Sequence, residues 1–165
     1  MPGVAMKDTC DVLRALPGWK AIVAMTADGG IGYRGGIPWH ITGDLRLFKQ
    51  LTLDQAVIAG RVTIATLPAL PRRRLHGISR STSIQSQQVV TWHHDFTTLP
   101  VSAWVIGGAR IYRQLLPQCT AVVVTQVQAR YETDTSFPTE LLNEFGIKHT
   151  IAYGDGFTTV VYLKD

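Results

Sequence analysis

Four short apolar runs constrain the fold of this chain more than any other feature. Each run carries few polar residues, which is typical of a strand that is buried on both faces. Two of the runs end at glycines, Gly60 and the pair Gly107-Gly108, and a helical pattern follows each of them. Because strands that alternate with helices favour an α/β fold, we predict a mostly parallel central sheet with flanking helices. The four runs cover residues 20–26, 56–59, 104–106 and 121–125.

The C-terminal segment has a different pattern. Residues 147–153 and 157–163 alternate between apolar and polar side chains on either side of Gly154-Asp155-Gly156. Two alternating runs joined by a short glycine-containing turn predict a β-hairpin. We therefore expect an antiparallel hairpin at one edge of the sheet.

Length and composition favour one globular domain. The chain has 165 residues, of which 45% are hydrophobic and 17% are charged, as in ordinary soluble proteins. No run approaches the ~20 apolar residues of a membrane span. We expect residues 19–165 to form the domain and residues 1–18 to be an N-terminal extension of unknown role, with a helical turn at 11–16. Nothing in residues 1–18 is apolar enough for the core of a secretion signal.

The charge and the cysteines narrow the class of ligand and the compartment. The formal net charge is +4, and the basic residues are spread apart except at 72–74. This balance fits ligands that carry phosphate and carboxylate groups as well as it fits nucleic acid. Cys10 and Cys119 are far apart, so we expect free thiols in a reducing, cytoplasmic compartment and no metal site.

The segment 36–52 predicts a glycine-rich loop that turns into a helix. Thr42 stands where an N-cap is expected, and Asp44 and Phe48 lie one turn apart on the same helical face. Acidic residues are common in a first turn because the helix dipole favours them there. The alternative is a buried carboxylate that accepts two parallel N–H bonds from a cationic or amidine-like ligand. The position of Asp44 alone does not decide between the two.

Three blocks of sequence resemble the dihydrofolate reductase family in order and spacing. The first contains Ile31-Gly32, Ile37-Pro38-Trp39, Asp44-Leu45, Phe48-Lys49 and Thr52, followed by Gly60-Arg61-Val62-Thr63. The second block is Val105-Ile106-Gly107-Gly108-Ala109-Arg110-Ile111-Tyr112, and the third is Thr125 followed by residues 131–138. The resemblance extends from about Trp19 to the C-terminus.

The resemblance implies reduction of 7,8-dihydrofolate by NADPH, with hydride transfer to pterin C6 and protonation of N5, in support of one-carbon metabolism. It implies catalytic roles for Asp44, Trp39, Thr125 and Tyr112. The substrate-binding residues that it implies are Ile22, Val23, Asp44, Leu45, Phe48, Lys49, Leu67, Leu70, Arg73, Ile106 and Thr125. The cofactor-binding residues are Ala24, Ile31, Gly36, Ile37, Gly60, Arg61, Val62, Thr63, Ser79, Arg80, Gly107, Gly108, Ala109, Arg110, Ile111 and Tyr112.

The resemblance also implies several local features. Residues 29–36 correspond to a lid over the nicotinamide, which we expect Asp134-Thr135 to touch, and a cis peptide is expected between Gly107 and Gly108. Arg73, or Arg72 as the alternative, is expected to hold the α-carboxylate of the glutamate tail, which suits a guanidinium. Residues 93–102 are too short for the helix that the family usually has there, and this puts the packing of the cofactor's adenine in doubt.

Other functions stay open at this point. A reductase of the riboflavin-pathway type shares the fold and NADPH, and a basic nucleic-acid-binding or partner-binding domain with the same fold is a rival that is not an enzyme. The pair His93-His94 has a metal-binding interpretation, but no acidic or thiol residue stands at ligand spacing. Val23, Leu45 and the shortened segment raise the hypothesis of an enzyme insensitive to trimethoprim and other antifolates. A monomer is expected.

Overall fold

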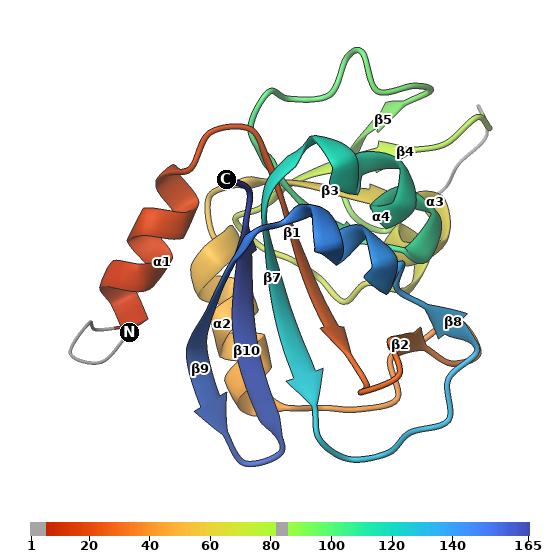
Figure 1. The fold of residues 1–165 in the computed structure, drawn as a ribbon. Helices are drawn as coiled ribbons and strands as arrows, with labels where there is room; N and C mark the ends of the chain where they lie inside the picture. Colours follow the sequence, from red (N-terminus) through yellow and green to blue (C-terminus); the bar gives the residue numbers. More distant parts are fainter. Residues whose placement is uncertain (1–5, 82–85) are drawn as a thin grey trace.

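The computed structural model describes residues 6–81 and 86–165. Within these residues an eight-stranded sheet has the order β5-β4-β3-β6-β1-β7-β10-β9 (Figure 1). The six strands from β5 to β7 in this order are parallel, whereas β10 is antiparallel to both β7 and β9. The sheet strands are β1 Trp19–Met25, β3 Ala56–Gly60, β4 Arg74–Ile78, β5 Val90–His93, β6 Ala103–Gly107, β7 Cys119–Val127, β9 Ile147–Gly154 and β10 Phe157–Leu163. The predicted parallel sheet and C-terminal hairpin are confirmed.

Helical segments cover both faces of the sheet. The remaining elements are α1 Met6–Ala15, α2 Thr42–Thr52, α3 Arg61–Thr66, α4 Ala109–Leu115, the 3₁₀ turns η1 Leu116–Gln118 and η2 Thr139–Glu144, and the short paired strands β2 Gly30–Gly32 and β8 Thr135–Ser136. One hydrophobic cluster packs α4, η1 and η2 against the sheet, and a second packs α1 and α2 against the other face. No helix in the described ranges is long and apolar enough to cross a membrane.

The N-terminal helix α1 is longer than predicted. It begins at Met6, whereas the sequence predicts only a turn at 11–16. Cys10 and Leu13 are buried and belong to the same hydrophobic cluster as Leu47 and Leu51 of α2. Since α1 gains its stability from this packing, its local sequence alone did not reveal its length.

The predicted N-cap of α2 is wrong. The helix already includes Thr42, and the N-cap is Ile41, which has extended backbone and makes no side-chain capping bond. A Cβ atom at Gly43 would lie 2.6 Å from the ring of Phe157, so glycine allows β10 to pack closely against the first turn. Tertiary packing, rather than a capping hydroxyl, therefore sets the start of this helix.

Two further segments bear on the site. Residues 94–102 form no helix, as expected from their length. The helical pattern expected after Gly107-Gly108 is α4, which is followed directly by η1, and Pro117 lies inside this 3₁₀ turn. The peptide between Gly107 and Gly108 is cis, as expected.

Candidate active site

The carboxyl ends of the parallel strands open into one large cleft of about 1080 Å³. This is the edge at which open α/β sheets bind ligands. The cleft is lined by β1, β3, β4 and β6, by the lid, and by residues from α2, α3 and α4. It gathers the predicted residues Ile22, Val23, Ala24, Ile31, Gly36, Ile37, Asp44, Leu45, Phe48, Gly60, Arg61, Val62, Thr63, Leu67, Leu70, Ser79, Arg80, Ile106, Gly107, Gly108, Ala109, Arg110, Ile111 and Tyr112.

Four predicted residues do not line the cleft. Trp39 is buried and packs on the ring of Tyr131, with the ring centroids 5.4 Å apart. Lys49 is exposed, and Arg73 lies on the segment beyond Leu70. Thr125 is buried in β7, where it contacts a cleft residue, Asp44, from behind.

Asp44 is a carboxylate in a largely apolar wall. It projects from the first turn of α2, with Leu45 and Phe48 beside it in the cleft lining. Burial raises the pKa of Asp44, and a hydrogen bond from the Thr125 hydroxyl opposes this rise. Burial is the larger cause, because a carboxylate loses hydration that one hydroxyl does not replace. Of the two interpretations of Asp44, the geometry therefore supports the buried carboxylate that faces a ligand rather than an acidic residue placed only by the helix dipole.

Tyr112 lines the cleft from α4 and lies near Asp44. Its phenol donates a 2.7 Å hydrogen bond to the carbonyl oxygen of Ile22 in β1. Burial, followed by the nearby charge of Asp44, raises the pKa of Tyr112. The phenol is therefore a neutral, fixed donor that ties α4 to β1.

Two glycine turns abut at the centre of the cleft. A Cβ atom at Gly60 would lie 3.1 Å from Ile111 and 3.9 Å from the Gly107 carbonyl oxygen. A Cβ atom at Gly108 would lie 3.2 Å from the Thr63 hydroxyl. Side chains at these positions would fill the space, so glycine leaves the backbone of both turns open to a ligand.

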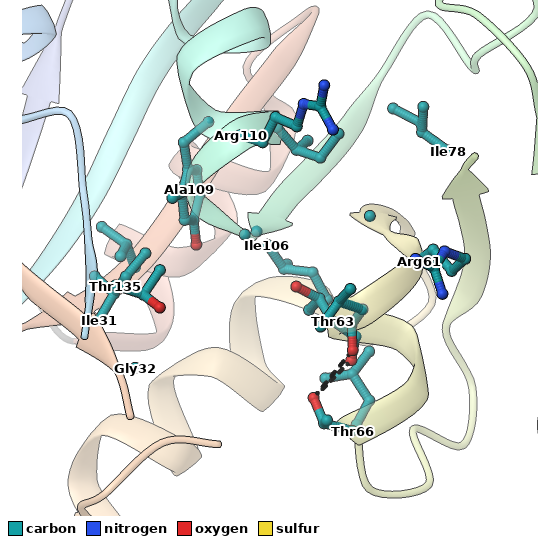
Figure 2. A pocket seen from close by; sticks show the side chains of 18 of the residues that line it. Ile31, Gly32, Arg61, Thr63, Thr66, Ile78, Ile106, Ala109, Arg110 and Thr135 are labelled. Carbon is teal, nitrogen blue, oxygen red and sulfur yellow. Dashed lines mark hydrogen bonds between the residues drawn. The ribbon is translucent and has the colours of Figure 1, made fainter. Parts of the chain in front are cut away.

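Positive charge gathers at one end of the cleft. Figure 2 shows Arg61 of α3 and Arg110 of α4 toward the end marked by Ile78, while Ile31, Gly32 and Thr135 lie at the other end. Arg80 also lines the cleft, after β4. Phosphate groups are the ligands that such a cluster of guanidinium groups binds well. The carboxylate of Asp44 and the arginines therefore create two chemically different regions in one cleft.

The lid is held by a short two-stranded sheet. Gly30 pairs with Ser136 and Gly32 with Thr135, and the Asp134 amide donates to the Gly32 carbonyl at 2.8 Å. The Asp134 carboxylate accepts a 2.9 Å bond from the Arg34 amide. The expected contact between the lid and the segment at 134–135 is thus confirmed. Ile31 of the lid and Ile37, directly after the lid, both line the cleft, and Ile37 is 68% exposed.

Sequence reasoning missed several residues that line the cleft. His94, Asp95 and Phe96, which belong to the segment without a helix at 94–102, line the cleft, and the His94 Nδ1 lies 3.1 Å from the Ser79 carbonyl oxygen. His93 points away from the cleft and pairs with His76, so the two adjacent histidines do not converge on one point. The other missed lining residues are Thr66, Pro68, Ile78 and Gln114. Gly32 and Gly35, which belong to the lid expected at 29–36, also line the cleft, as do Thr135, which was expected to touch the lid, and Ser81, next to Arg80.

The two candidate arginines of the basic triplet have different environments. Arg72 forms an ion pair with Asp54, with an Nη2 to Oδ2 distance of 2.6 Å. Arg73 donates from Nη1 to the Pro71 carbonyl oxygen at 2.8 Å, while its buried Nε has no partner among the described residues. Buried N–H groups are nearly always hydrogen-bonded, so the unpaired Nε suggests that a ligand supplies the acceptor. Arg73 is therefore the better candidate for a carboxylate of the ligand.

Comparisons with known proteins agree on one family. A sequence model described as dihydrofolate reductase matches residues 19–157. The dihydrofolate reductase of Mycoplasma pneumoniae is 30% identical over 157 residues, which cover 88% of this chain and 97% of that relative. The dihydrofolate reductase of Mycobacterium leprae is 38% identical over 116 residues, covering 64% of this chain and 70% of that relative.

A solved structure has the same fold. It is a dihydrofolate reductase from Enterococcus faecalis complexed with NADP(H) and RAB-propyl. Its TM-score to this chain is 0.76 at 22% sequence identity, and the alignment covers 91% of this chain and all of that one. The similarity therefore includes nearly the whole described molecule.

Proposed function

This chain belongs to the dihydrofolate reductase family, and we propose how its own residues carry out the reduction of 7,8-dihydrofolate to tetrahydrofolate with NADPH. The proposal rests on one observation above all. Asp44 of α2 lines the same cleft as Arg61 of α3 and Arg110 of α4. Burial raises the pKa of Asp44. One end thus suits a ring with N–H donors, and the other suits phosphates.

In the proposed complex the pterin ring lies beside α2. The ionised Asp44 carboxylate accepts two parallel N–H bonds from the 2-amino group and ring N3. Val23, Leu45 and Phe48 supply an apolar wall for the ring. Beyond them, Leu67 and Leu70 line the cleft on the way to Arg73, which we propose binds the α-carboxylate of the glutamate tail.

The residues on the other side of the cleft fit NADPH. The open backbone at Gly60 and Gly107-Gly108 admits a pyrophosphate, which Arg61 and Arg110 would neutralise. Ser79 and Arg80 offer a hydroxyl and a cation for the 2′-phosphate. Ala24, Ile31, Gly36, Ile37, Val62, Thr63, Ala109, Ile111 and Tyr112 are the remaining residues that we propose contact the cofactor.

The chemistry divides between cofactor and protein. NADPH, when bound, supplies the hydride from C4 of its nicotinamide to C6 of the pterin. Asp44 binds and polarises the pterin, while Thr125 holds the carboxylate from behind. The lid excludes bulk water and retains the single water that we propose delivers the proton to N5. Trp39 and Lys49 lie outside the cleft lining, and their proposed roles are indirect.

We propose a monomer in the cytoplasm, with small-molecule ligands rather than nucleic acid as its partners. Both cysteines are buried free thiols, which suits a reducing compartment. Antifolates with an amidine edge would meet the same Asp44. Insensitivity to trimethoprim stays a prediction, carried by Val23, Leu45 and the absent helix.

The test follows NADPH absorbance after dihydrofolate is added to the wild type and to Asp44→Asn. The variant keeps the shape but loses the charge that accepts both N–H bonds. We expect a fall in kcat/KM for dihydrofolate of about 100-fold or more, with unchanged NADPH affinity. Undiminished turnover by Asp44→Asn at neutral pH would overturn the mechanism. If the wild type binds NADPH but does not reduce dihydrofolate, a ribosylated pyrimidine becomes the substrate to test.

A further inference from the structure

A buried pair of threonine hydroxyls stands behind the substrate-binding carboxylate. Thr125 of β7 and Thr159 of β10 are directly opposite each other in the antiparallel pairing. Their Oγ1 atoms are 2.8 Å apart, and the two residues are only 1% and 0% exposed. Thr125 also hydrogen-bonds to Asp44. Thr159, which is no part of the cleft lining, is therefore linked to the carboxylate that binds the pterin through two successive hydrogen bonds, with Thr125 between them.

The direction of the two hydrogen bonds follows from counting protons. Each hydroxyl donates one proton, and an ionised carboxylate can only accept. If Thr125 donated to Thr159, Asp44 would lose its donor, and the Thr159 proton would be buried without an acceptor, because Thr125 is its one partner among the described residues. If Thr159 donates to Thr125, Thr125 is free to donate to Asp44 and both protons are satisfied.

We infer that Thr159 is a positioning residue for dihydrofolate binding: its hydroxyl orients the Thr125 hydroxyl so that Thr125 donates to the Asp44 carboxylate. This inference rests on the proposed function of Asp44. The chain of donors is Thr159 to Thr125 to Asp44, across β10, β7 and α2. In such a chain each bond polarises the next, so the bond to the carboxylate is stronger than Thr125 alone would make it.

The surroundings keep the hydroxyl pair dry. The Phe157 ring, two residues before Thr159 on the same face of β10, packs against the first turn of α2 at Gly43. Phe157 is itself 8% exposed. Hydrogen bonds at a site with so little water are electrostatically stronger than exposed ones. The apolar packing and the hydroxyl chain therefore act on the same carboxylate.

The charged groups around Asp44 are few. Tyr112 faces it from α4 as a neutral phenol. β1 presents Ile22, Val23 and Ala24 to the cleft, and β7 and β10 present the two hydroxyls. On α2 itself Arg46 and Lys49 are exposed to solvent. Among the described residues, the hydrogen bond from Thr125 is the interaction that lowers the pKa of Asp44 against the effect of burial.

Thr159→Val tests the inference with almost no change of shape. The readout is the pKa of Asp44, taken from the carboxyl ¹³C shift of protein labelled at aspartate, with the Asp44 signal assigned by its loss in Asp44→Asn. Because the Thr125 bond to the carboxylate weakens, we expect the pKa of Asp44 to rise by about half a unit in Thr159→Val. Thr159→Ser keeps a hydroxyl and should titrate like the wild type.

The matched control is Thr158→Val, the same change one residue away. Thr158 points to the other face of β10, where it accepts a 3.4 Å bond from Gln128, so its loss should leave the pKa of Asp44 unchanged. An Asp44 pKa that stays in place or falls in Thr159→Val would overturn the inference. An equal rise in Thr159→Ser would also overturn it, because packing rather than the hydroxyl would then be the cause.

A kinetic readout separates positioning from stability. The ionised Asp44 that binds dihydrofolate is lost as the pH falls through its pKa. The acid limb of kcat/KM for dihydrofolate should therefore move upward with the carboxyl pKa in Thr159→Val, while NADPH affinity stays the same. The titration needs neither substrate nor cofactor. A wild type without dihydrofolate turnover would refute the proposed function. The titration would still decide whether the Thr159 hydroxyl supports the hydrogen bond from Thr125 to Asp44.

Discussion

At the scale of single residues, the cleft contains polar groups that are buried at a cost in free energy. Asp44 keeps its carboxylate beside Leu45 and Phe48, and burial raises its pKa. The buried Arg73 Nε has no partner among the described residues. Such groups cost folding free energy, and a ligand with complementary charge or N–H donors recovers that cost on binding. Unsatisfied polar groups are therefore the clearest residue-scale sign of what this cleft binds.

Arg73 provides the first prediction at this scale. In Arg73→Lys, the planar fork that suits a carboxylate is replaced by a point charge. We expect KM for dihydrofolate to rise by about tenfold, whereas reduction of a dihydropterin without the glutamate tail stays unchanged. Steady-state kinetics with both substrates measure the difference.

Arg72→Lys is the matched control for Arg73. Arg72 is held by Asp54 at 2.6 Å, away from the cleft lining, so the substitution should leave both substrates unaffected. The assignment to Arg73 would be wrong if Arg72→Lys raised KM for dihydrofolate to the same extent. It would also be wrong if Arg73→Lys slowed both substrates equally.

At the scale of elements, α2 has two faces with different tasks. Asp44, Leu45 and Phe48 face the cleft, while Leu47 and Leu51 are buried in the cluster shared with α1. The C-terminal half of α1 is tied to the same helix, since Arg14 donates to the Gln50 carbonyl oxygen at 2.9 Å. Lys20, fully buried, donates to the carbonyls of Arg14 and Leu16. We propose that α1 braces the helix that binds the substrate.

Leu13→Ala tests this brace. Leu13 is 5% exposed and packs in the cluster with Leu47 and Leu51. The cavity should lower the free energy of unfolding by about 3 kcal/mol, which urea denaturation measures. Because α2 is then less well placed, KM for dihydrofolate should rise while KM for NADPH stays near that of the wild type.

Val12→Ala is the control on the other face of α1, where Val12 is 63% exposed. It should change stability and both KM values very little. A Leu13→Ala enzyme that is less stable but has wild-type KM for dihydrofolate would show that α1 supports the fold without positioning α2.

At the scale of the whole molecule, we predict that a histidine pair at one edge of the sheet makes the free energy of unfolding depend on pH. His76 of β4 and His93 of β5 are joined by a 2.9 Å contact between Nδ1 and Nε2, and His93 also contacts Thr98 at 2.6 Å. This bond needs one of the rings to be a neutral acceptor. Burial lowers the pKa of both histidines, with further lowering of His76 by His93 and Arg74.

The sign of the pH effect follows from proton uptake. The folded pKa values lie below the ordinary value of 6.5, so the unfolded chain takes up protons that the folded chain resists. The free energy of unfolding should therefore fall as the pH drops from about 7.5 to about 5.5. Urea denaturation at a series of pH values measures it, and His93→Gln should flatten this dependence.

His149→Gln is the corresponding control, because His149 is exposed on the edge strand β9. Its pH dependence should match that of the wild type. If His93→Gln retained the full loss of stability over this pH range, the pair would not be the source of the effect.

Local sequence patterns predicted those strands and cleft residues that depend on a single segment of the chain. The buried runs predicted β1, β3, β6 and β7, and Gly60, Gly107 and Gly108, which the family resemblance implied as cofactor-binding residues, line the cleft. Two predictions failed where packing overrode a local rule: Ile41, not Thr42, is the N-cap of α2, and α1 extends from Met6 to Ala15. The sequence did not predict the lining residues His94, Asp95 and Phe96, because this segment has no regular pattern of apolar residues.

The sequence by itself determined the parallel sheet, the C-terminal hairpin and the placement of Asp44 next to Phe48, because apolar periodicity and residue spacing act within one segment. Only the tertiary structure decided which groups meet from distant segments. Thr159 reaches Thr125 across 34 positions, and α1 supports α2 from the side opposite the cleft. Such contacts depend on strand register and helix packing, which are set by the whole chain rather than by any one segment.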